Sequence, residues 1–281
     1  MDTRDPLVTA EWLKANIDAP DVRIVDSTWF MPPGDTANTG ERAYHKGHIP
    51  GAVFFDIDKI ADQSSALKHM LPDPILFSSR VRALGIGDGN RIIVYDQNGF
   101  FASARVWWML RVMGHRDVHV LDGGFAAWQA ANGSVEDLPP VAVERHFTAR
   151  VRADLVVDAN QVASLSEANT GTIIDSRPAG RFTGESPEPR PDLKSGHIPG
   201  SRSVPGSELL KQDGTMKDAN DLKKLFGDLA PPVVTSCGSG VTAGVTALAL
   251  ARIGYWDVAV YDGSWSDWAA DTSRPIATGA A

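Results

Sequence analysis

The single cysteine of the chain, Cys237, stands in a context that favours a nucleophile. It follows Pro232–Thr235, predicted as a buried strand, and opens the segment CGSGVT (residues 237–242), after which a helical pattern begins. A loop between the end of a strand and the start of a helix exposes successive backbone N–H groups, and the helix adds a partial positive charge there. Both effects favour an anion, so we expect a reactive thiolate. A buried, unreactive cysteine is the alternative that position alone leaves open.

Two copies of one sequence pattern supply the elements that must position this loop. GHIPG occurs at Gly47–Gly51 and again at Gly196–Gly200, and residues 91–128 align without a gap to residues 231–268. Each copy alternates short β-branched runs with longer helical stretches, such as the strand Arg91–Tyr95 followed by the helix Ala102–Met113. The order strand, helix, strand predicts an α/β fold with two tandem domains, each a parallel sheet flanked by helices.

The two expected domains differ in their loops. Turn and breaker residues gather between the copies, and we place the first domain at residues 17–137, a linker at 138–166 and the second domain at 167–278. The ungapped alignment puts Gln97 opposite Cys237, and the loop QNGFFAS (residues 97–103) of the first copy offers no nucleophile. We therefore expect an inactive first domain and a catalytic second domain.

The motifs of the chain together carry a family resemblance. The strand–CGSGVT–helix unit, GHIPG, IIDSRP (residues 173–178) and VYDGSWSDW (residues 260–268) resemble the rhodanese superfamily, and the tandem copies resemble its two-domain sulfurtransferases. Within that family CGSGVTA is most similar to the loop of 3-mercaptopyruvate sulfurtransferases, whereas thiosulfate sulfurtransferases typically resemble CRKGVT. The resemblance implies that Cys237 attacks the sulfur of the donor, pyruvate leaves, and a cysteine persulfide remains for an acceptor.

The charge of the loop favours the same donor. Thiosulfate is a compact dianion that cations beside the thiolate would help to hold, but Gly238 and Ser239 are neutral. A donor with a single carboxylate bound elsewhere suits such a loop better, and the resemblance implies that Arg181 and Arg190 bind it. A planar guanidinium can grip a carboxylate with two hydrogen bonds. A thiosulfate sulfurtransferase is the alternative. The loop residues expected to contact the substrate are Gly238, Gly240, Val241 and Thr242.

The resemblance also implies a Ser–His–Asp arrangement. Ser239 is its expected serine, acting on the leaving enolate, and His48 of the first GHIPG is its expected histidine. Asp35 and Glu41 both remain candidates for the acidic member. His197 occupies the same place in the second GHIPG, so the alternative is that His48 only stabilises a turn.

Composition and the remaining motifs argue against other classes of function. A net charge of −8 disfavours nucleic acid or an anionic membrane as partner, and no apolar run approaches the roughly 20 residues of a membrane span. One cysteine permits no internal disulfide or thiolate zinc site, and the histidines lack metal-site spacing, so no cofactor is expected. A cysteine phosphatase would need an arginine where Ala243 stands.

The sulfur acceptor must come from outside the chain. With no second cysteine, the persulfide cannot be resolved internally, so we expect an external thiol such as a thioredoxin-like protein, or cyanide in an assay. The first twenty residues show no signal peptide, which together with the lone cysteine predicts a cytoplasmic protein. A non-enzymatic sulfur carrier is the remaining alternative, and Arg181 and Arg190 argue against it.

Overall fold

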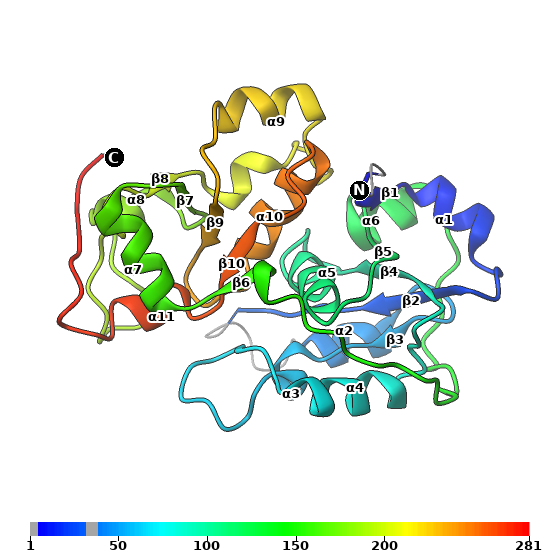
Figure 1. The fold of residues 1–281 in the computed structure, drawn as a ribbon. Helices are drawn as coiled ribbons and strands as arrows, with labels where there is room; N and C mark the ends of the chain where they lie inside the picture. The colour runs from blue at the N-terminus through cyan, green and yellow to red at the C-terminus, as the bar shows by residue number, and fades with distance from the viewer. Residues whose placement is uncertain (1–4, 32–38, 281) are drawn as a thin grey trace. The chain divides into compact units, whose positions relative to one another are not determined.

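The computed structural model describes residues 5–31 and 39–280, which form two compact units (Figure 1). Each unit is a parallel sheet with helices packed against it, so the predicted fold class is confirmed. The first unit comprises Met1–Ser64, Leu71–Arg152 and Gln212–Met216, and the second comprises Ser65–Met70, Ala153–Lys211 and Lys217–Ala281.

The sheet of the first unit has five strands in the order β1-β5-β4-β2-β3, all paired in parallel. Its strands are β1 (Leu7–Val8), β2 (Val22–Asp26), β3 (Val53–Phe54), β4 (Arg91–Tyr95) and β5 (Val118–Leu121). Its helices are α1 (Ala10–Asn16), α2 (Gly40–Lys46), α3 (Ile57–Ile60), α4 (Pro74–Ala83), α5 (Ser103–Val112) and α6 (Gly124–Ala130).

The sheet of the second unit repeats this topology, with five parallel strands in the order β6-β10-β9-β7-β8. Its strands are β6 (Val156–Val157), β7 (Thr172–Asp175), β8 (Arg202–Ser203), β9 (Val233–Ser236) and β10 (Ala259–Tyr261). Its helices are α7 (Ala159–Ala168), α8 (Ala179–Thr183), α9 (Ala219–Phe226), α10 (Ala243–Arg252) and α11 (Ser264–Trp268), with 3-10 turns η1 (Ala153–Leu155) and η2 (Gly206–Leu209).

Equivalent residues build the core of each unit. Trp128 and Trp268 are almost fully buried, and each donates its indole N–H to a backbone carbonyl, which satisfies the one polar atom of the ring. The helices that follow the central strands, α5 and α10, end near Gly114 and Gly254, whose φ angles of +89° and +101° suit glycine. The helix predicted over Ala102–Met113 is therefore present as α5, and α10 is its counterpart in the second unit.

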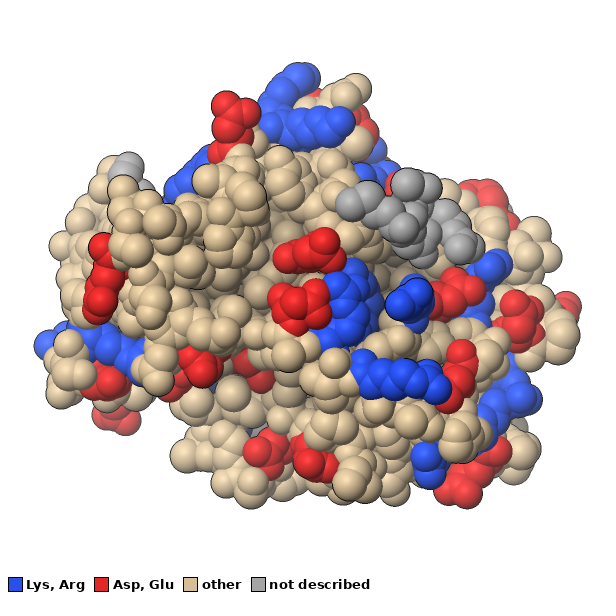
Figure 2. Space-filling view, viewed as in Figure 1, with Lys and Arg blue, Asp and Glu red and all other residues tan. Residues whose placement is uncertain are grey.

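Helix α9 shows how the local sequence sets the orientation of a helix. The side chain of Asp218 accepts two backbone N–H groups at its start, and Leu222 and Phe226, four residues apart, are buried. The opposite face is exposed and carries charged side chains of both signs, which gather over this helix at the top of Figure 2.

The expected domain boundaries differ from the units at their amino-terminal sides. A first domain starting at residue 17 omits β1 and α1, which belong to the first sheet and its cover. The expected linker, residues 138–166, contains β6 and most of α7, which belong to the second unit. Both missed strands have two residues, too few to show an alternating pattern.

In the first unit, Asp96 takes the structural place of the cysteine, so the alignment with Gln97 is wrong by one residue. The N–H of Phe125 donates to the carbonyl of Asp96 just as that of Trp265 donates to the carbonyl of Cys237. The strand registers show the same one-residue shift. The loop from Asp96 to the start of α5 spans seven positions (103 − 96), and that from Cys237 to the start of α10 spans six (243 − 237).

Candidate active site

Cys237 lies between the last residue of β9 and the loop that leads into α10, and is 1% exposed. Two hydrogen bonds fix its backbone: its N–H donates to Ser264 Oγ at 3.1 Å, and its carbonyl accepts the Trp265 N–H at 3.0 Å. The Ser264 hydroxyl also lies 4.0 Å from the Cys237 sulfur. Ser264 adopts a φ of +52°, an unusual value for a residue with a Cβ, which marks a position under local constraint. The cysteine is held at the carboxyl end of the sheet.

The loop after Cys237 presents backbone N–H groups that the protein does not use. In the described chain, those of Gly238, Ser239, Val241 and Thr242 have no protein acceptor. The Gly238 carbonyl is turned the other way, where it accepts the N–H and the hydroxyl of Ser266 at 3.0 and 2.5 Å. Gly240 permits this path with a φ of +78°. Free donors beside the start of α10 form a nest suited to an anion.

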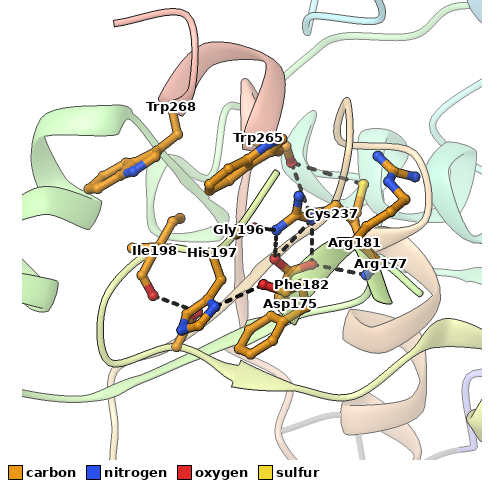
Figure 3. A network of polar contacts seen from close by, with 12 residues as sticks. Asp175, Arg177, Arg181, Phe182, Gly196, His197, Ile198, Cys237, Trp265 and Trp268 are labelled. Carbon is orange, nitrogen blue, oxygen red and sulfur yellow. Dashed lines mark hydrogen bonds and ion pairs between the residues drawn. The ribbon is translucent and has the colours of Figure 1, made fainter. Parts of the chain in front are cut away.

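Arg181 places a positive charge at this nest. It lies in α8, and its Nη2 is 3.2 Å from the point that a Cβ on Gly238 would occupy. Figure 3 shows its guanidinium beside the sulfur of Cys237. The same guanidinium binds Glu188, with Nε 3.1 Å from Oε1 and Nη2 2.5 Å from Oε2. A cation held this close to the loop can attract an anionic donor.

Arg177 and Glu188 support this site, and sequence reasoning missed both. Arg177 is 1% exposed, binds both oxygens of Asp175 and donates to the Gly196 carbonyl at 2.6 Å. Its Nη1 donates to Glu188 Oε1 at 2.7 Å. Its guanidinium lies 4.2 Å from the centre of the Trp265 ring. Both side chains are drawn in Figure 3. Arg177 lies inside the motif IIDSRP and Glu188 lies between Arg181 and Arg190, but nothing in the sequence indicated that either is buried.

The partner of Ser239 is His69, which no sequence motif identified. His69 Nδ1 lies 3.1 Å from Ser239 Oγ, and the residue is 8% exposed. It belongs to the segment Ser65–Met70, which clusters with the second unit although its chain neighbours on both sides belong to the first. Such a contact depends on where a loop lies in space, which local patterns do not encode.

His48, the expected histidine of the Ser–His–Asp arrangement, has the contacts of a structural residue within the first unit. It is 0% exposed in the first unit, its Nδ1 lies 2.8 Å from the carbonyl of Tyr44, and its ring stacks on that of Tyr44 at 3.9 Å. Its backbone pairs with Glu136. His197 repeats this arrangement in the second unit, stacking on Phe182 at 3.8 Å with its Nδ1 2.9 Å from the carbonyl of that residue. The recurrence reflects a turn that both copies need.

The other expected site residues have mixed placements. Glu41 binds Lys59 at 3.1 Å on the surface of the first unit, and Asp35 lies outside the described residues. Arg190 is half-buried in the segment after α8, and among the residues 5–31 and 39–280 its side chain has no hydrogen bond or ion pair. Its guanidinium is therefore not committed to a partner within the described chain.

The matching loop of the first unit holds a carboxylate of its own. Asp96 Oδ2 accepts the N–H groups of Ala102 and Ser103, at 3.1 and 2.9 Å, at the start of α5. Burial raises the pKa of Asp96, and these hydrogen bonds offset only part of that rise. The first unit thus fills internally the place where the second unit has its cysteine.

The described residues contain neither a candidate metal site nor a membrane-spanning helix. No group of three or more His, Cys, Asp or Glu side chains comes together there as a metal ion would require. No helix among them has the length and apolar character needed to cross a bilayer.

Comparisons with known proteins identify the family. The rhodanese-like domain matches residues 9–131 and 158–271. The 3-mercaptopyruvate sulfurtransferase of Escherichia coli (strain K12) is 42% identical over 273 residues, covering 96% of each chain. The mitochondrial thiosulfate/3-mercaptopyruvate sulfurtransferase 1 of Arabidopsis thaliana is 40% identical, over 98% of this chain and 78% of that protein.

A solved structure agrees with these relatives. The crystal structure of SseA from Escherichia coli, described as a 3-mercaptopyruvate sulfotransferase with the rhodanese fold, matches with a TM-score of 0.84 and 41% identity. The match covers 93% of this chain and 99% of that one. The resemblance predicted from the motifs is confirmed, and the chain belongs to the rhodanese family.

Proposed function

We propose that the protein is a sulfurtransferase that moves the sulfur of 3-mercaptopyruvate, through a persulfide on Cys237, to a thiol or cyanide acceptor. The observation that carries this proposal is the arrangement at one loop: a cysteine, a row of free N–H groups, and the Arg181 guanidinium above Gly238. The relatives named for 3-mercaptopyruvate, which cover nearly the whole chain, favour that donor.

The first half of the reaction loads the cysteine. The Cys237 thiolate attacks the donor sulfur, forming an S–S bond while the C–S bond of the donor breaks. The electron pair of that bond goes to the carbon fragment, which leaves as the enolate of pyruvate, and the sulfur stays as a persulfide. The free N–H groups of the loop stabilise the negative charge of the thiolate and of the persulfide that replaces it.

The enolate must then gain a proton. The Ser239 hydroxyl lies in the loop and pairs with His69, so this couple can deliver a proton to the leaving fragment and recover one from solvent. In the second half of the reaction an acceptor thiolate attacks the outer sulfur, which breaks the S–S bond and restores the Cys237 thiolate.

The donor's carboxylate requires a cationic partner. Arg181 is held at the loop, and Arg190 has a guanidinium that the described chain leaves uncommitted. We assign the carboxylate to these two arginines, because a guanidinium can bind it with two hydrogen bonds while the neutral loop accommodates the keto end.

The lone cysteine supports our proposals for the sulfur acceptor and for the cellular compartment of the protein. An external thiol, such as that of a thioredoxin-like protein, must collect the sulfur because the chain has no resolving cysteine. A single free cysteine also agrees with a reducing compartment such as the cytoplasm.

The decisive experiment combines donor competition with intact mass. Sulfur transfer from 3-mercaptopyruvate and from thiosulfate is measured side by side. The intact mass of the protein is then measured by mass spectrometry after exposure to donor without acceptor. We expect 3-mercaptopyruvate to be preferred, the mass to rise by one sulfur atom and reductant to reverse the rise. Cys237→Ser should lose both the adduct and turnover. Wild-type activity in that variant would refute the persulfide mechanism, and a preference for thiosulfate would refute the donor.

A further inference from the structure

We propose that Glu188 is a positioning residue: it holds the Arg181 guanidinium over the Cys237 loop and determines which edge of it can meet an anionic donor. The inference rests on the proposed function, because it concerns the same donor site.

The first observation is the burial and saturation of Glu188. Its side chain is 1% exposed, and a buried carboxylate is costly unless it is paired. Both of its oxygens bind arginines: Oε1 accepts from Arg177 and from Arg181 Nε, and Oε2 accepts from Arg181 Nη2. Glu188 thus links the side chain of a fully buried arginine to that of the arginine at the loop.

The second observation is that the inner end of this link is anchored. Asp175 at the end of β7 binds Arg177 with both oxygens, and the Trp265 ring covers the guanidinium of Arg177. Two carboxylates and two arginines alternate along the chain Asp175–Arg177–Glu188–Arg181, so their formal charges cancel. This cancellation allows the group to be buried without an excess charge. The rigidity of β7 therefore reaches Arg181 through charged hydrogen bonds.

The third observation concerns the N–H groups of Arg181 that Glu188 does not bind. Of five guanidinium N–H groups, Glu188 takes that of Nε and one of Nη2. The two N–H groups of Nη1 and the second of Nη2 remain, and one from each of these nitrogens points along the end edge of the guanidinium. Nη2 is also the atom nearest to Gly238. An incoming carboxylate must therefore bind this end edge, and it cannot bind the side edge that Glu188 fills.

A neutral amide cannot replace Glu188. All three contacts place an arginine N–H against a carboxylate oxygen, so the NH₂ group of a glutamine would face an arginine donor in either amide orientation. Arg181 is the outermost of the four ion-paired residues, with a side chain that is 14% exposed, so it is the arginine that can move away from position 188. Loss of Glu188 should thus displace Arg181 rather than Arg177.

The experiment is a double-mutant cycle between Glu188 and Arg181. Glu188→Gln should raise KM for 3-mercaptopyruvate about tenfold with kcat changed less, the pattern of a lost binding contact. In the Arg181→Gly background the same change should add less than twofold, because its target is gone. Glu185→Gln, an exposed change in the same segment, is the matched control and should leave KM as in the wild type. Glu188→Asp, which keeps the charge, should recover part of the loss.

A second readout does not depend on turnover. The rate of Cys237 alkylation is measured with iodoacetate, which carries a carboxylate, and with neutral iodoacetamide. The ratio of the two rates reports the cation over the loop, and it should fall severalfold in Glu188→Gln and in Arg181→Gly but not in Glu185→Gln.

These measurements distinguish a failure of the positioning role of Glu188 from a failure of the proposed carboxylate site. A Glu188→Gln variant with wild-type KM and alkylation ratio overturns the positioning role, as does an equal effect in both backgrounds of the cycle. If Arg181→Gly alone leaves KM unchanged, the carboxylate assignment of the proposed function fails, and the alkylation ratio then decides whether Glu188 still places a cation at the loop.

Discussion

Replacement of His69 by alanine tests the catalytic couple most directly, and His48→Ala is the matched comparison. The His69 ring has its Nδ1 3.1 Å from Ser239 Oγ, whereas the His48 ring is stacked on Tyr44 and hydrogen-bonded to its carbonyl. Both are histidines with little exposure, at 8% and 0%. The two substitutions should nevertheless fail in different ways, one in rate and the other in stability.

For His69→Ala we expect kcat to fall by about 10²- to 10⁴-fold, the usual contribution of a general acid–base group. That range corresponds to roughly 2.7–5.4 kcal/mol of activation free energy. Ser239→Ala should cost a similar factor, and the double variant should be little worse than either single one, because the two groups act as a unit.

For His48→Ala we expect a loss of stability of about 2–4 kcal/mol with kcat close to that of the wild type. Its removal takes one of two hydrogen bonds from the Tyr44 carbonyl, which keeps the Gly47 N–H, at about 0.5–1.5 kcal/mol, and also creates a cavity. Steady-state kinetics with 3-mercaptopyruvate and urea unfolding of all four variants make the comparison. A kcat for His69→Ala within threefold of the wild type, or factors that multiply in the double variant, would refute the assignment of the couple.

Three further predictions concern the two loops. Asp96→Asn should become more stable relative to the wild type as pH rises. Burial raises the pKa of Asp96, so its ionisation destabilises the folded wild type; this cost is absent below the unfolded pKa and complete above the folded pKa. Urea unfolding of both proteins from pH 4 to 8 without that trend would contradict this. Ser264→Gly should relieve the backbone strain of a φ of +52° but lose the hydroxyl that accepts the Cys237 N–H. We therefore expect kcat to fall severalfold with little change in thermal midpoint. An unchanged kcat would show that this hydrogen bond does not matter for turnover. The pair Gly238→Arg with Ser239→Lys should raise the kcat/KM ratio of thiosulfate over 3-mercaptopyruvate at least about tenfold, or ~1.4 kcal/mol, and a double alanine control with the same shift would show that charge is not the cause.

Local signals in the sequence were sufficient to predict the fold class, which is confirmed, and to select Cys237 as the candidate nucleophile, which stays a prediction. The repeat of GHIPG and the alternation of β-branched runs with helical stretches each depend on neighbours along the chain, and they predicted two parallel α/β domains. Cys237 could be singled out because a strand end, glycines and a helix start stand side by side in the sequence. The neutral Gly238 and Ser239 could be read in the same way. These features are determined by backbone preference and spacing alone.

Tertiary structure decided the partners of these residues. A one-residue difference in loop length hid the equivalence of Asp96 and Cys237, because an ungapped alignment cannot detect an insertion that hydrogen bonding reveals. His69 reaches Ser239 across 170 positions of the chain, from a segment with no motif.

The charged residues that support the site show the same limit of sequence reasoning. Arg177 and Glu188 were visible in the sequence as ordinary charged residues, which are usually exposed. Only the fold buries them together with Asp175 and Arg181. Because a buried charge must find a partner inside the protein, the four side chains bind one another in a chain of ion pairs. The sequence by itself singled out the candidate nucleophile, and the tertiary structure decided which side chains hold the surrounding charges in place.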